Sequence, residues 1–103
     1  MAQMNIQKLM KQAQQAQAQM MAAQAEIANQ TVEASAGGGM VKVTMSGDQQ
    51  LKSVKIDPAA VDPADVELLE DMVLAAVNEA ARSAAELANS RMESITGGLN
   101  LPF

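Results

Sequence analysis

Lysines are the residues of this 103-residue chain whose type and spacing best suit binding chemistry. Lys8 and Lys11 are three residues apart, which places them on one face of a helix. Lys42 and Lys55 lie in a stretch with the alternation of β-strands. An ammonium group binds phosphate or carboxylate oxygens, so these positions favour recognition of an anion. The alternative for Lys8 and Lys11 is a solvated helix surface without a ligand.

The charge of the chain is distributed unevenly. Residues 1–56 hold five lysines against three acidic residues, whereas residues 57–103 hold Arg82 and Arg91 against nine acidic residues. The net charge is −5. An anion-binding surface must therefore be built mostly from the first half of the chain.

Catalytic and metal-binding chemistry find little support in the composition. The chain has no histidine and no cysteine, and no glycine-rich loop leads from a strand into a helix. The glycines at 37–39 instead fit a turn between two strands, and the acidic residues that follow Asp62 fit helix capping. We therefore expect no enzyme, no metal and no cofactor.

Residues 31–56 show the two-residue period of a half-buried sheet. Val41, Val43 and Met45 alternate with polar residues, and glycines lie on both sides of this run. The pattern predicts an antiparallel meander with strands at about 31–35, 40–46 and 51–56. Gly37–Gly39 and Gly47 are predicted to supply positive φ angles in the two turns.

The side chains also predict the register of the three strands. Pairing Val43 with Val54 and Val41 with Ile56 places the apolar groups on one face, and a one-residue slip would reverse that face. Closing the first hairpin over residues 36–39 pairs Val32 with Val43.

The same register predicts the polar face of the sheet. Lys42 lies directly opposite Lys55, and Glu33 lies opposite Lys42. Two opposed lysines are unfavourable unless a negative charge is near. Either Glu33 supplies that charge or an external anion shares the site.

Long helical segments flank the meander. The first runs from about residue 2 to 28, and the second from about 63 to 95, with Asp62 as N-cap, Pro63 in the first helical position and a stop at Gly97–Gly98. A short tail covers residues 96–103. The first helix carries a heptad-spaced apolar stripe of Ile6, Leu9, Ala13, Ala16, Met20, Ala23 and Ile27.

These elements predict one α+β domain over residues 1–103, in the order helix–three-stranded antiparallel meander–helix. Helices of roughly 40 Å or more are longer than strands of about 20 Å, so their ends must project as arms. With a single aromatic residue, a core of Val, Leu, Ile, Ala and Met lacks the large burial contribution of aromatic side chains. We therefore expect a homodimer. Without cysteine, a signal-like start or a run of about 18 apolar residues, the chain is expected to be cytoplasmic.

The ordered set of motifs resembles the YbaB/EbfC family of bacterial nucleoid-associated proteins over essentially the whole chain. The resemblance implies a tweezer-shaped cytoplasmic homodimer in the nucleoid that binds double-stranded DNA with little sequence preference. The motifs are the Met/Gln-rich first helix, Glu33–Gly39, Val41–Val43, Val54–Pro58, Leu69–Met72, Ala75–Asn78 and Thr96–Leu99.

The same resemblance assigns roles to the cations, because such binding rests on neutralising phosphates with Lys and Arg. Lys8 and Lys11 are the leading expected contacts. The further candidates are Arg82 and Arg91 on the second helix and Lys42 and Lys55 on the sheet. Without aromatic stacking residues, single-stranded binding is disfavoured. The alternative function is a protein-binding helical scaffold or regulator with incidental DNA binding.

Overall fold

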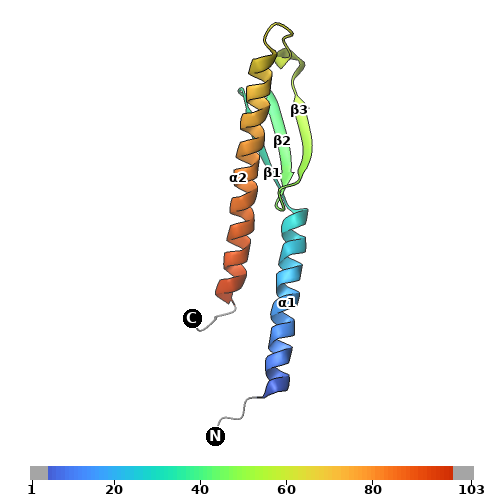
Figure 1. Cartoon of the computed structure of the whole chain (residues 1–103), viewed down its shortest axis with the longest axis vertical. Helices are drawn as coiled ribbons and strands as arrows, with labels where there is room; N and C mark the ends of the chain where they lie inside the picture. The colour runs from blue at the N-terminus through green and yellow to red at the C-terminus, as the bar shows by residue number, and fades with distance from the viewer. Residues whose placement is uncertain (1–4, 99–103) are drawn as a thin grey trace.

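A computed structural model of the chain describes residues 5–98, and it has the predicted order of elements (Figure 1). Two long helices flank a three-stranded antiparallel sheet, and a short 3₁₀ helix lies in the connection to the second long helix. The elements are α1 (Ile6–Asn29), β1 (Thr31–Ala36), β2 (Val41–Ser46), β3 (Leu51–Ile56), η1 (Pro58–Ala60) and α2 (Val66–Gly98).

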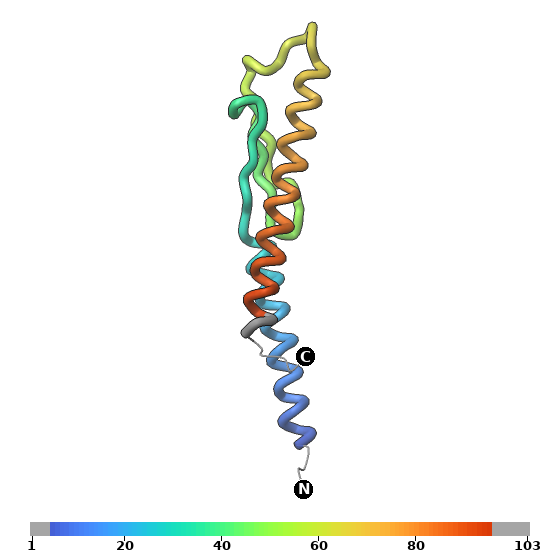
Figure 2. Tube along the Cα trace, turned by 90° about the vertical axis from the view of Figure 1, so that its left-hand side faces the viewer, coloured from blue at the N-terminus to red at the C-terminus, as the bar shows by residue number. Residues whose placement is uncertain are grey.

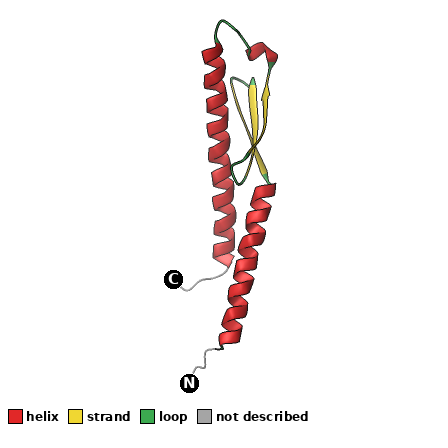
Figure 3. Cartoon of the chain, turned by 45° about the vertical axis from the view of Figure 1, so that its right-hand side comes forward, coloured by secondary structure: helices red, strands yellow, loops and turns green. Residues whose placement is uncertain are grey.

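The molecule is a rod of 79 × 21 × 16 Å. One end is formed by the sheet with the first part of α2 against it, and the other end by α1 (Figure 3). α2 runs along the sheet and then beside the last part of α1, while the first half of α1 extends past the end of α2 (Figures 1 and 2). The α+β class and the projecting helices are thus confirmed.

The sheet has the strand order β1-β2-β3, and the predicted register of its second hairpin is confirmed. Val43 pairs with Val54, Val41 with Ile56 and Lys42 with Lys55. The register shifts after Thr44, so that Lys52 is an extra residue on β3. Such a bulge increases the local twist of a strand pair.

The predicted register of the first hairpin was wrong by two residues. Val32 pairs with Met45 rather than Val43, and Glu33 pairs with Thr44 rather than Lys42. The turn comprises residues 37–40 instead of 36–39, since Ala36 and Val41 still pair. A shift by two keeps each side chain on its predicted face but changes its neighbour.

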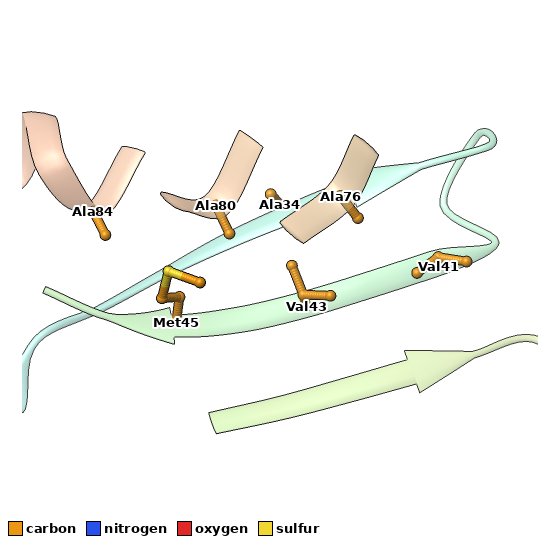
Figure 4. Close-up of a cluster of buried hydrophobic side chains, with 7 residues drawn as sticks. All are labelled: Ala34, Val41, Val43, Met45, Ala76, Ala80 and Ala84. Atoms are coloured by element: carbon orange, nitrogen blue, oxygen red, sulfur yellow. The ribbon is translucent and has the colours of Figure 1, made fainter. Parts of the chain in front are cut away.

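The core is a layer of small side chains between α2 and the first two strands (Figure 4). Alanines at a spacing of four place a narrow stripe of α2 against the sheet. Because alanine is short, the helix can approach the strands closely, but each contact buries little apolar area. The buried residues of this cluster are Ala34, Val41, Val43, Met45, Ala76, Ala80 and Ala84.

Helix boundaries differ from the prediction at both ends of α2. The helix begins at Val66, and its cap is Asp65, which accepts a hydrogen bond from the Leu68 amide. Asp62 instead closes a preceding turn by accepting from the Ala64 amide at 2.9 Å. The helix also continues through Gly98, so residues 96–98 are not part of a tail. The predicted tail residues 99–103 lie outside the described range.

α1 begins one residue after its N-cap, Asn5, whose side chain accepts from the Lys8 amide at 3.2 Å. Its predicted start at residue 2 lies outside the described residues. Of the predicted apolar stripe, only Ala23 and Ile27 are buried. Ile6 is 66% exposed and Leu9 47%, so the first half of α1 presents its stripe to solvent.

Gly47 joins the β2–β3 turn to the end of α1. Its amide donates to the Gln30 carbonyl at 2.9 Å, and a Cβ at this position would lie 2.4 Å from the Ile27 carbonyl oxygen. The predicted positive φ belongs instead to Gln49, with a φ of 64°. Gly47 is therefore required for close approach of two backbones. The first turn does use positive φ, at Gly37, Gly38 and Gly39.

Gly47→Ala should lower the free energy of unfolding by about 2–4 kcal/mol, because the added methyl group must displace the last turn of α1. Gly38→Ala is the control, since its φ of 67° costs about 1 kcal/mol while no atom beyond the two neighbouring residues lies within 4 Å of the new Cβ. Urea denaturation measures both. An equal loss of unfolding free energy in the two variants would mean that α1 moves aside for the added methyl group at little cost.

Candidate nucleic-acid interface

Lys8 and Lys11 lie in the first half of α1, the part that extends past α2 (Figure 1). Both side chains are exposed, and neither forms an ion pair within residues 5–98. From Lys11 to the end of α1 is roughly 27 Å at 1.5 Å per residue. These lysines therefore form a cationic surface of their own, remote from the sheet.

Arg82 and Arg91 are both engaged by glutamates. Arg82 pairs with Glu79 at 2.8 Å on the exposed surface of α2. Arg91 pairs with Glu26 of α1 at 2.5 Å, which links the two helices. Glu26 holds Nη2 of Arg91, which both bidentate edges of the guanidinium share, so a phosphate must displace that carboxylate to bind Arg91 in bidentate fashion. Glu79 holds Nη1 of Arg82 and lowers the positive potential there. The arginines are thus less available for an external anion than the lysines.

Lys42 and Lys55 are brought together on the face of the sheet that points away from α2. They lie directly opposite one another on β2 and β3. The cleft at this position has a volume of about 270 Å³. Its lining also includes a carboxylate and two hydroxyl groups, from Glu33, Thr44 and Ser53.

The structure thus divides the predicted cations into separate groups. Lys42 and Lys55 share one cleft, Lys8 and Lys11 share one helix, and each arginine has its own glutamate. Sequence analysis did not identify Thr44 and Ser53 as candidate site residues, although their two-residue spacing from Lys42 and Lys55 placed them on the same face. It also missed Glu26 as the partner of Arg91, since 65 residues separate the two.

Within residues 5–98, no group of three or more acidic, histidine or cysteine side chains is arranged to hold a metal ion. In that same part of the chain, no helix combines the length and the apolar character needed to cross a bilayer.

The fold and the exposed lysines define an elongated α+β protein with cationic surfaces on its first helix and on its sheet. The chain belongs to the YbaB/EbfC DNA-binding family, whose family model matches residues 1–99.

Relatives of this chain carry names that agree with the family. A nucleoid-associated protein of Moorella thermoacetica is 55% identical over 98 residues, which cover 95% of this chain and 94% of that protein. A nucleoid-associated protein of Ruminiclostridium cellulolyticum is 52% identical over 95 residues, which cover 92% of this chain and 83% of that protein.

The fold also matches a solved structure. The crystal structure of an uncharacterized protein from Helicobacter pylori aligns with a TM-score of 0.78 at 18% identity. The alignment covers 91% of this chain and 99% of that one, so the two share the whole fold.

Proposed function

We propose that this protein is a nucleoid-associated homodimer that binds double-stranded DNA with little sequence preference, through contacts of Lys and Arg with phosphates. The observation that carries the proposal is the exposed pair Lys8 and Lys11 on a projecting helix of a YbaB/EbfC family member. Contacts with phosphates position a protein on DNA without reading its bases. The protein would then reside in the cytoplasm, at the nucleoid.

The distribution of charge supports a backbone-binding mode. Every lysine lies in residues 1–56, and no lysine of the described range forms an ion pair. A phosphate can therefore approach these ammonium groups without displacing a protein carboxylate. Lys42 and Lys55 contribute a second surface, while Arg82 and Arg91 contribute where phosphate replaces their glutamates.

An uncovered apolar face supports the homodimer. α2 packs on β1 and β2 (Figure 4). On the same face of β3, Val54 is 42% and Ile56 39% exposed. Beside it lies an apolar groove of about 490 Å³, formed with α2. A second copy that covers this face would bury the area that the alanine-rich core lacks. The groove is lined by Ile56, Leu69, Glu70, Val73, Leu74 and Val77.

The salt dependence of DNA binding tests the function. Two α1 lysines from each subunit would neutralise four phosphates, so log affinity against log salt should fall with a slope of about −4, and steeper with each further contact. Fluorescence anisotropy with a labelled duplex measures this slope. Unrelated duplexes of equal length should compete almost equally.

The opposite results would favour the protein-binding scaffold. The exposed apolar side chains of α1, among them Ile6 and Leu9, are the feature that such a scaffold would use. Absence of binding at low salt, or an affinity that does not change with salt, would remove DNA backbone as the ligand.

A further inference from the structure

We propose that the outer-face cleft, defined by Glu33, Lys42, Thr44, Ser53 and Lys55, binds a DNA backbone phosphate and that Glu33 restrains this binding. The inference rests on the proposed DNA-binding function and adds a built site to it. It makes the sheet, and not only the helical arms, part of the interface with DNA.

Lys42 and Lys55 have no acidic partner among residues 5–98. Lys42 lies directly opposite Lys55, an arrangement that is unfavourable without a nearby negative charge. The observed register places Glu33 opposite Thr44, so Ser35 is the neighbour of Lys42 on β1. Neither lysine forms an ion pair with Glu33 or with any other carboxylate of residues 5–98. An anion from outside the chain would relieve the repulsion between them.

Hydroxyl groups complete the chemistry that a phosphate requires. Thr44 and Ser53 pair directly across β2 and β3, two residues along each strand from the lysine pair and on the same face. Both side chains are half-buried, and neither forms a side-chain hydrogen bond among the described residues. Two hydroxyl-bearing side chains and two lysine side chains therefore line one cleft of about 270 Å³. A phosphodiester oxygen accepts hydrogen bonds from both kinds of group.

Glu33 adds a fixed negative charge to the rim of the same cleft. The residue is exposed and lines the cleft together with both lysines. It lowers the positive potential that an approaching phosphate meets, although it is not close enough to either lysine to form an ion pair. Glu33 should thus weaken binding of the phosphate without closing the site.

The cleft is separate from the α1 lysines. Lys11 is roughly 27 Å from the end of α1, and the sheet begins only beyond that end (Figure 1). One phosphate cannot contact both surfaces, so their contributions to the salt dependence should add. One phosphate in each cleft of a dimer should steepen the slope of log affinity against log salt by about 2.

Removing the carboxylate provides the sharpest test, because it predicts a gain. Glu33→Gln should raise affinity for a duplex at low salt by about three- to tenfold for each cleft that a phosphate occupies, the scale of removing one like charge from the neighbourhood of a phosphate. Glu86→Gln is the matched control, since it makes the same change of charge at an exposed position of α2. An equal gain in both variants would reduce the effect to net charge and overturn the proposal.

Removing the ammonium and hydroxyl donors of the cleft should lower the affinity for DNA. Lys42→Gln combined with Lys55→Gln should flatten the slope by about 2 and abolish the gain from Glu33→Gln, whereas Lys52→Gln on the bulge should do neither. Thr44→Val combined with Ser53→Ala should weaken binding without changing the slope.

If the wild type binds DNA while these variants bind equally well, the cleft is not a phosphate site and the proposed function stands. If the wild type does not bind DNA, both proposals fail.

Discussion

Val43→Asp should unfold the protein at 25 °C. Val43 is fully buried between β1 and β3, beneath the alanines of α2 (Figure 4). A carboxylate at this position would be enclosed by apolar groups without a partner, at a cost of several kcal/mol. Total stabilities of domains are about 5–15 kcal/mol, and this alanine-rich core belongs at the lower end. Loss of the cooperative transition in circular dichroism would show the effect.

Val54→Asp is the matched control, because it places the same charge directly opposite on the same face of the sheet. Val54 is 42% exposed within one chain, so the subunit should tolerate the change. The proposed homodimer would cover that face, and the variant should therefore dissociate. Sedimentation equilibrium should give twice the 10.8 kDa chain mass for the wild type and a value near one chain for Val54→Asp. A wild type that sediments as a folded monomer would contradict the homodimer.

The register of the sheet shows where local patterns specify a structure. The pairing of Val43 with Val54 was predictable, because any one-residue slip would turn the valines to the polar face. The first hairpin differed because three consecutive glycines accept positive φ at every position, so turns over residues 36–39 and 37–40 are both allowed. A two-residue change of register preserves the buried face, and apolar periodicity cannot distinguish the two pairings.

Helix α2 shows a similar limit at its ends. Asp62 and Asp65 are both able to accept a hydrogen bond from an amide two or three residues later, and both do so. Only the hydrogen bond to Asp65 caps the start of α2. The hydrogen bond to Asp62 belongs to a separate turn that precedes the helix. At the other end, the glycines at 97 and 98 permit a stop but do not impose one, and the helix continues through them.

Tertiary contacts decided how available each predicted cation is. The lysines could be assigned to faces from spacing alone, and the opposition of Lys42 and Lys55 followed from the register. The pairing of Arg91 with Glu26 depends on how α2 lies beside α1, which no local pattern reports. The close approach of Gly47 to Ile27 likewise depends on a tertiary contact, between the β2–β3 turn and the end of α1. Sequence analysis therefore gave the positions of the charges but not their partners.

Replacing Lys8 and Lys11 by glutamate should remove most DNA binding while leaving the protein folded. Each subunit loses two ammonium groups and gains two carboxylates, so the dimer loses four phosphate contacts and repels the backbone. We expect affinity at low salt to fall by about a hundredfold or more and the salt slope to flatten by about 4. Folding should persist, because both side chains are exposed and an acidic residue in the first turn of a helix, where Lys8 lies, is favourable.

A control with equal charge separates lost contacts from general repulsion. Lys8→Gln with Lys11→Gln changes the chain by two charges, and Gln14→Glu with Gln17→Glu makes the same change on exposed residues of the same helix. Only the lysine pair should flatten the slope, since the slope counts neutralised phosphates rather than net charge. If both pairs leave the slope unchanged, the phosphates are bound elsewhere on the protein, and α1 is not the DNA-binding arm.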